Sequence, residues 1–152
     1  MSQVTESQVQ RWATELLAQH ELSGWTFHLD RARNRLGQCD YTRRRITLSR
    51  HVLENNDESI VRDTLLHEIA HARVGPGHAH DAVWRAEAAR IGAQPHATAD
   101  ATVNLPPGKW LLVCLTCQTV VARRHHRRLQ LDRVACRGCG PRHSQLHWQL
   151  AD

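Results

Sequence analysis

The residues best suited to chemistry lie at positions 67 to 71, where the chain reads His-Glu-Ile-Ala-His. Positions i and i+4 of a helix lie on one face, so His67 and His71 can bind the same metal ion. Glu68 is one position further round the helix and can reach a water at that metal without being a ligand itself. The spacing predicts hydrolysis by a zinc-bound water, with Glu68 as general base. The alternative is a histidine-rich helix that binds no metal.

A catalytic zinc also needs a third protein ligand and an open coordination position. Two further histidines, His78 and His80, follow the predicted helix in the segment Gly-Pro-Gly-His-Ala-His. Either of them can bring a third imidazole to the metal, and the spacing alone does not choose between them.

Four of the five cysteines form two CxxC pairs that are separated by eighteen residues. They are Cys114, Cys117, Cys136 and Cys139. In a chain without a recognisable secretion signal, such pairs favour metal thiolates over disulfides. Four thiolates fill a tetrahedral site, so we predict a closed, structural zinc in a zinc ribbon; a rubredoxin-type iron centre and unligated cysteines are the alternatives. Cys39 is left over and is expected to be a small buried residue.

Positive charge is concentrated in the last third of the chain. Residues 1–106 carry 12 Arg against 13 Asp and Glu, whereas residues 107–152 carry 7 Arg and 1 Lys against 2 Asp. Four of these arginines lie between the cysteine pairs: Arg123, Arg124, Arg127 and Arg128. The guanidinium group suits phosphate contacts, so we expect this stretch to bind DNA. The alternative is a solvated, solubilising surface.

The remaining pattern predicts the elements that must position these residues. Apolar periodicity and capping residues indicate helices over about 9–17, from about Asp57 to Val74, and over 78–91. Alternating residues indicate strands at 25–30 and on both sides of a polar turn at 42–44. Trp84 is expected to pack the third helix against the second, and Tyr41 to pack within the sheet rather than to act in catalysis. The fold class is α+β, with a small, mostly antiparallel sheet.

The chain of 152 residues is long enough for one core with a small appended module. We expect a catalytic domain at 1–100, a linker at 101–109 and a basic four-cysteine zinc ribbon at 110–152. No apolar run approaches the roughly 20 residues that span a bilayer, and the first residues do not resemble a signal peptide. We therefore expect the protein to be intracellular and cytoplasmic, and to have no membrane partner.

The histidine motif and the segment after it resemble the SprT-like zinc metallopeptidases, the family that includes the DNA–protein crosslink protease Spartan. That family has HExxH in a helix and then His-Gly-x-x-Phe/Trp. Aligning its aromatic residue with Trp84 places the third ligand at His80, with Asp81 in place of the usual glycine and His78 as the alternative. The stretch from Arg35 to Ser49 is similar to the family's glycine-marked strand, turn and Ile-x-Leu-Ser strand.

The resemblance implies a zincin-like domain that cleaves proteins associated with DNA. It also implies a zinc-binding C-terminal domain, which in some relatives helps to recognise DNA. Two zinc ions are therefore expected, one catalytic and one structural. The main alternative is a DNA-binding or adaptor protein whose metal sites are only structural. A second alternative is a zinc hydrolase that acts on something other than protein.

Overall fold

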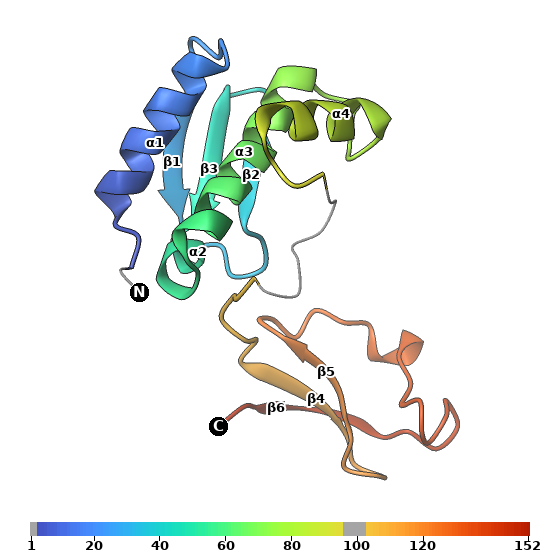
Figure 1. Cartoon of the computed structure of the whole chain (residues 1–152). Coiled ribbons are helices and arrows are strands. Elements are labelled where there is room, and N and C mark those ends of the chain that lie inside the picture. The colour runs from blue at the N-terminus through green and yellow to red at the C-terminus, as the bar shows by residue number, and fades with distance from the viewer. Residues whose placement is uncertain (1–2, 96–102) are drawn as a thin grey trace. The chain divides into compact units, whose positions relative to one another are not determined.

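The computed structural model describes residues 3–95 and 103–152. The chain divides into two compact units, one within residues 1–105 and one within residues 106–152 (Figure 1). Helices and a small sheet form the first unit, and a second small sheet with the four paired cysteines forms the second. The expected α+β class with a C-terminal ribbon is confirmed. No helix in the described part of the chain is long and apolar enough to cross a membrane.

The first helix, α1 (Glu6–Gln19), begins at a capping box. The Thr5 hydroxyl accepts a hydrogen bond from the Gln8 amide, and the Gln8 side chain accepts one from the Thr5 amide. These bonds satisfy donors that a helix start otherwise leaves free. The expected apolar positions of this helix, from Val9 to Leu17, are buried.

The first sheet contains β1 (Thr26–Asp30), β2 (Gly37–Asp40) and β3 (Arg45–Ser49) in the order β1-β3-β2. The pairing of β3 with β2 is antiparallel, but its pairing with β1 is parallel, so this sheet is mixed. The most apolar strand takes the centre, because Ile46 and Leu48 are fully buried there. As a result, β2 forms one edge of the sheet.

The helix that carries the histidine pair is α3 (Glu58–Val74). Of the expected caps, Asp57 is the one used, and its carboxylate accepts from the Ile60 amide at 3.1 Å. The helix ends at Gly75, whose φ of 84° favours glycine. A short helix, α2 (Arg50–Asn55), lies between β3 and α3 and was not expected from the sequence.

The expected helix over 78–91 is shorter, since α4 spans Ala82–Ile91. Asp81 is its N-cap and accepts from the Trp84 amide at 3.0 Å. His80 has a φ of 55°, which lies outside the right-handed helical region. Residues 78–81 therefore form a loop, and the prediction of helix there was wrong.

One face of the first sheet is covered by α1 and α3, which also pack against each other. Their apolar side chains join those of β1, β3 and α2 in the main core. A smaller cluster, Ala70, Trp84, Ala88 and Ala93, joins α3 to α4. Together these contacts hold α3 between the sheet and α4.

The second unit is an antiparallel sheet in the order β5-β4-β6, from β4 (Trp110–Cys114), β5 (Val120–Arg124) and β6 (Leu146–Leu150). A single 3-10 turn, η1 (Leu131–Arg133), lies between β5 and β6. Of the predicted linker, residues 101 and 102 lie outside the described residues. Its next residues are held to the first unit, where the Asn56 side chain hydrogen-bonds the backbone amide and carbonyl of Asn104 at 2.7 and 2.8 Å.

Candidate metal and catalytic site

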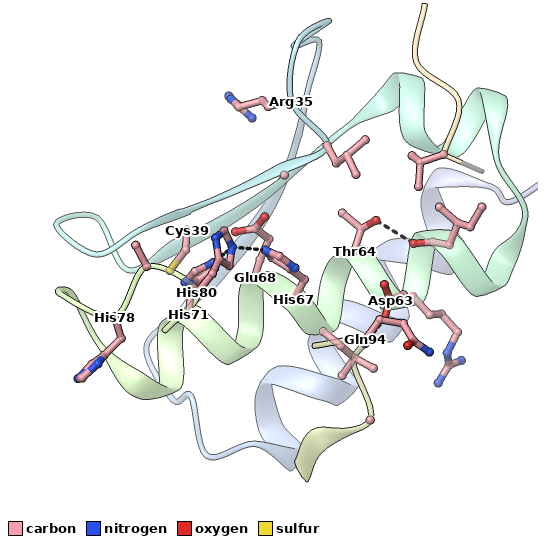
Figure 2. Close-up of a pocket in the computed structure, with 18 of the residues that line it drawn as sticks. Arg35, Cys39, Asp63, Thr64, His67, Glu68, His71, His78, His80 and Gln94 are labelled. Carbon is pink, nitrogen blue, oxygen red and sulfur yellow. Dashed lines mark hydrogen bonds between the residues drawn. The ribbon is translucent and has the colours of Figure 1, made fainter. Parts of the chain in front are cut away.

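Three histidines of the first unit converge on one point. His67 and His71 come from α3, and His80 comes from the loop before α4. The Nε2 atom of His80 lies 3.0 Å from that of His67 and 3.0 Å from that of His71. Figure 2 shows the three rings beside one another above α3.

This donor set fits a zinc ion. Zinc binds imidazole nitrogen at about 2.0–2.1 Å in a tetrahedron, for which two ligand atoms lie about 3.3 Å apart. The separations of 3.0 Å from His80 to the other two nitrogens are close to this value, and all three nitrogens lie within 4.8 Å of one another. Three protein ligands leave one position of the tetrahedron open. Hydrogen bonding does not explain the cluster, because His80 Nε2 carries either one proton or one lone pair and so cannot make a good hydrogen bond to both neighbouring nitrogens.

The charge state of the three rings also suits metal binding, which requires neutral imidazole. Burial, and then the neighbouring His71 and His80, lower the pKa of His67 to about 4. Burial and His80 lower the pKa of His71 to about 4. The pKa of His80 is lowered by burial and by Arg85.

The two candidates for the third ligand occupy different places. His80 joins the cluster, whereas His78 points away from it and its Nδ1 atom lies 2.8 Å from the Asp81 carboxylate (Figure 2). Asp81 thereby holds both ends of the loop, through the His78 ring and through the first turn of α4. The structure therefore offers His80, and not His78, to a metal held by His67 and His71.

Glu68 lies beside these rings and is 7% exposed. Burial raises the pKa of its carboxyl to about 8, against which the charge of Arg35 acts. A dication held by the neighbouring histidines would lower this pKa again, since an opposite charge favours the carboxylate. Glu68 is thus placed to exchange a proton with a water near the three rings.

Comparison with known families decides how this geometry is classified. Residues 5–104 match the SprT-like family. This range includes β2 and the three histidines of the cluster. The chain belongs to the SprT-like family. Comparisons with curated proteins and with solved structures gave no match. Membership of the SprT-like family indicates a metallopeptidase-like activity for the first unit, and the match ends before the ribbon begins.

In this SprT-like unit, Trp84 supports all three histidine rings. Its own ring is fully buried, and its centroid lies 4.6, 5.2 and 4.5 Å from those of His67, His71 and His80. The sequence predicted that Trp84 packs α4 against α3, and the contact with every histidine of the cluster adds to that role. Such packing restricts the directions that the rings can take.

A cavity of about 1180 Å³ contains the cluster. Its walls come from β2 and the loop before it, from one face of α3, from the loop between α3 and α4, and from Val103 and Leu105. Residues from Ser59 to His71 of α3 contribute to it. At 1.5 Å per residue, the cavity follows this helix for about 18 Å.

Two side chains from the β2 region reach this cavity, although the sequence assigned them only to packing. The Tyr41 hydroxyl donates a hydrogen bond to the carbonyl of His71 at 3.2 Å. Cys39 is half-buried against the core, and burial, followed by the charge of Glu68, raises its pKa to about 12. The signal that could have placed them is their spacing, since residues two apart on a strand share a face.

In the second unit, the four paired cysteines also converge. The Sγ atoms of Cys114 and Cys139 are 3.8 Å apart, and those of Cys117 and Cys136 are 3.5 Å apart. A tetrahedral zinc with bonds of about 2.3 Å places two sulfur ligands about 3.8 Å apart. None of the four forms a disulfide. This cluster fits a closed zinc site that lacks room for a substrate.

The four predicted DNA-binding arginines are exposed, at the end of β5 and just after it. Three of them have defined partners within the ribbon, and one of these is Arg124, whose Nη1 donates to the carbonyl of Arg123 at 2.9 Å. Arg123 Nε donates to the carbonyl of Gly108 at 2.6 Å, and the guanidinium of Arg127 lies 4.3 Å from the centre of the Trp110 ring. These contacts leave part of each guanidinium group free for a further partner.

Proposed function

We propose that this SprT-like protein is a zinc-dependent metallopeptidase that hydrolyses peptide bonds in proteins bound to DNA. The observation that carries the proposal is the convergence of three histidine nitrogens beside a buried glutamate, on the wall of a long cavity. A purely structural metal site, as in an adaptor protein, has no use for an open position with a carboxyl group next to it.

His67, His71 and His80 would hold the metal, with Trp84 fixing the directions of their rings. Zinc bound there would supply Lewis-acid polarisation of the peptide carbonyl and would acidify a water. Glu68 would take the proton of that water and would then give it to the leaving amine. Burial of Glu68 suits this exchange, because little bulk water reaches the carboxyl group to compete for the proton.

The length of the cavity favours a polypeptide over a small substrate. A stretch of about 18 Å has room for roughly five residues of extended chain, at about 3.3 Å per residue. The volume of about 1180 Å³ also exceeds the range of roughly 300–1000 Å³ that is usual for small-molecule sites. This argues against the alternative of a zinc hydrolase that acts on small molecules.

The test of this function is Glu68→Gln, which keeps the side chain's size but cannot accept a proton. Hydrolysis of an unfolded protein such as casein should fall by at least about 100-fold. Elemental analysis should still find two zinc ions per chain. His71→Ala is the contrasting variant, because it should lose both the activity and the metal of the histidine site. If Glu68→Gln cleaved casein within a few-fold of the parent rate, Glu68 would not be the general base.

We further propose that the ribbon brings the enzyme to DNA through phosphate contacts. The support is the excess of positive charge in residues 107–152 and the exposure of Arg123, Arg124, Arg127 and Arg128. Arg127 over Trp110 adds a flat surface next to these charges, which suits an unstacked base.

Replacing these four arginines by alanine should weaken DNA binding at every sequence. If they contact about three or four phosphates, the slope of log affinity against log salt should flatten by about three. The measurement is a titration of labelled single- and double-stranded DNA at several salt concentrations. The matched control removes the same charge from exposed arginines of the first unit: Arg11, Arg31, Arg33 and Arg44. Equal slopes for the two quadruple variants would show that only net charge matters.

A further inference from the structure

Gly37 lies in strand β2 at a place where a side chain does not fit. A Cβ atom built on it would lie 2.9 Å from Cγ of Glu68, 2.9 Å from Oε1 of Glu68 and 2.9 Å from Cδ2 of Leu48. Its backbone is not in the left-handed region that only glycine adopts readily. Since glycine inside a strand costs stability, the reason for it here is space and not conformation.

Two of these three atoms belong to the proposed general base, Glu68. In the described part of the chain, no hydrogen bond or ion pair holds the Glu68 carboxyl group, and its charged neighbour Arg35 is bound to Asp30 at 2.7 Å. Figure 2 shows this carboxyl group directed from α3 towards the strands. Its place is therefore set by packing, with the bare Cα of Gly37 on one side.

We infer that Gly37 is the positioning residue of Glu68: the missing side chain leaves the space in which the Glu68 carboxyl group reaches the water. This inference rests on the proposed role of Glu68. In Gly37→Ala the new methyl group meets Glu68 and Leu48 at the same distance. Leu48 is fully buried in the core, whereas Glu68 lines the cavity, so Glu68 has the room to give way. A general base acts within about 2.6–3.2 Å, and a misplacement of about 1 Å costs roughly 100-fold in rate.

The contact can be tested without any activity, by a cycle of thermal unfolding on the zinc-loaded full chain. Gly37→Ala should lower the melting temperature by about 5 °C in the parent. In a Glu68→Ala background the same change should cost less than half as much, because Cγ and Oε1 of Glu68 are gone. An equal loss in both backgrounds, or a gain in the parent, would overturn the inference.

The catalytic consequence is tested by casein hydrolysis with the same variants. Gly37→Ala should lower kcat about 10- to 100-fold, change KM by less than about 2-fold, and keep both zinc ions. In a Glu68→Gln background it should lower the residual rate no further, since a residue that acts only through Glu68 has nothing left to position. Gln38→Ala, which changes an exposed side chain of the same strand, should leave kcat unchanged.

The possible failures are distinguishable. If Gly37→Ala reduces the rate equally with and without Glu68, it acts through general damage and the inference is wrong, while the metallopeptidase function stands. If Glu68→Gln is as active as the parent, the proposed function itself fails. Where Gly37→Ala does not fold, the double variant Gly37→Ala with Leu48→Val makes space on the side of Leu48. Its kcat should then lie within about 2-fold of that of Leu48→Val alone, because the methyl group no longer displaces Glu68, and a larger loss would overturn the inference.

Discussion

At the scale of single residues, Glu68 combines two demands that oppose each other. It must be buried to lie beside the three histidines, and burial raises the pKa of its carboxyl to about 8. The histidines experience the opposite effect, since burial lowers the pKa of His67 and of His71 to about 4. All four groups are thus held in their neutral forms when no cation is bound. A dication bound by the histidines would favour the ionised form of Glu68, and its binding would stabilise the folded state.

These shifts predict how the stability of protein with a metal-free histidine site depends on pH. A buried Glu68 keeps its proton up to about pH 8, whereas the unfolded chain releases it near its ordinary pKa of 4.5. Stability from this group is therefore lost as pH rises between these values. His67 and His71 act in the opposite direction below about pH 6.5, so the loss due to Glu68 should be seen from pH 6.5 to 8.

Glu68→Gln removes this ionisation and should abolish the fall in stability between pH 6.5 and 8, by up to about 2 kcal/mol at pH 8. Far-UV circular dichroism is a suitable measure, because the α-helices of the described chain all lie in the first unit. A parent and a variant with parallel pH profiles would show that Glu68 ionises normally in the metal-free protein.

What the sequence predicts at this scale depends on local geometry. His67, Glu68 and His71 are related by helix periodicity, so their relative places follow from their spacing alone. The role of Gly37 does not follow from spacing, because Glu68 and Leu48 become its neighbours only when the strands and α3 pack together. A strand glycine is visible in the sequence, but the residue that needs its space is not.

At the scale of elements, the loop between α3 and α4 decides the third ligand. His80 has a positive φ, and Asp81 accepts from the Trp84 amide at 3.0 Å while its other oxygen lies 2.8 Å from the His78 ring. The same carboxylate therefore begins α4 and ties down the loop that carries His80. Asp81 makes these two contacts at the position where the SprT-like motif usually has glycine, which has no side chain to make them.

Asp81→Ala should consequently weaken metal binding as well as α4. Loss of the cap should cost about 1 kcal/mol of stability, and the loosened loop should lower the zinc affinity of the histidine site about 10-fold. Asp57→Ala is the matched control, because Asp57 caps α3 through the Ile60 amide, and Ile60 lies about two helical turns before His67. Competition against a coloured chelator measures the affinity. If both variants lose zinc equally, the effect is one of overall stability.

The elements themselves were predictable where one periodicity continues over several turns, as in α1 and α3. The start of α4 was predicted four residues too early, because apolar spacing does not reveal that Asp81 turns its side chain back to cap the helix. The parallel pairing of β1 with β3 was also hidden, since it depends on β3 entering between two earlier strands. Both differences arise from contacts that form only when the elements meet.

At the scale of the whole molecule, the two clusters of metal-binding residues lie in separate compact units. The unit of the histidine cluster has a core of its own, with sixteen buried residues from α1, β1, β3, α2 and α3 among others. The ribbon has few buried apolar residues, chiefly Leu112 and Val113 beside Cys114 and Cys136. Its fold should therefore depend on its metal far more than that of the first unit.

This division predicts two zinc ions with different lability. The histidine site keeps an open position, whereas four thiolates close the ribbon site, so a mild chelator should remove one zinc and leave the other. The helical signal should persist after that removal, because the first unit keeps its core.

Cys136→Ser is the complementary variant: it should unfold the ribbon, while the histidine site still binds one zinc. The measurements are elemental analysis and circular dichroism after each step. A preparation with a single zinc, held only by the ribbon, would contradict the metallopeptidase assignment, because the histidine cluster would then have failed to bind its metal in a folded protein.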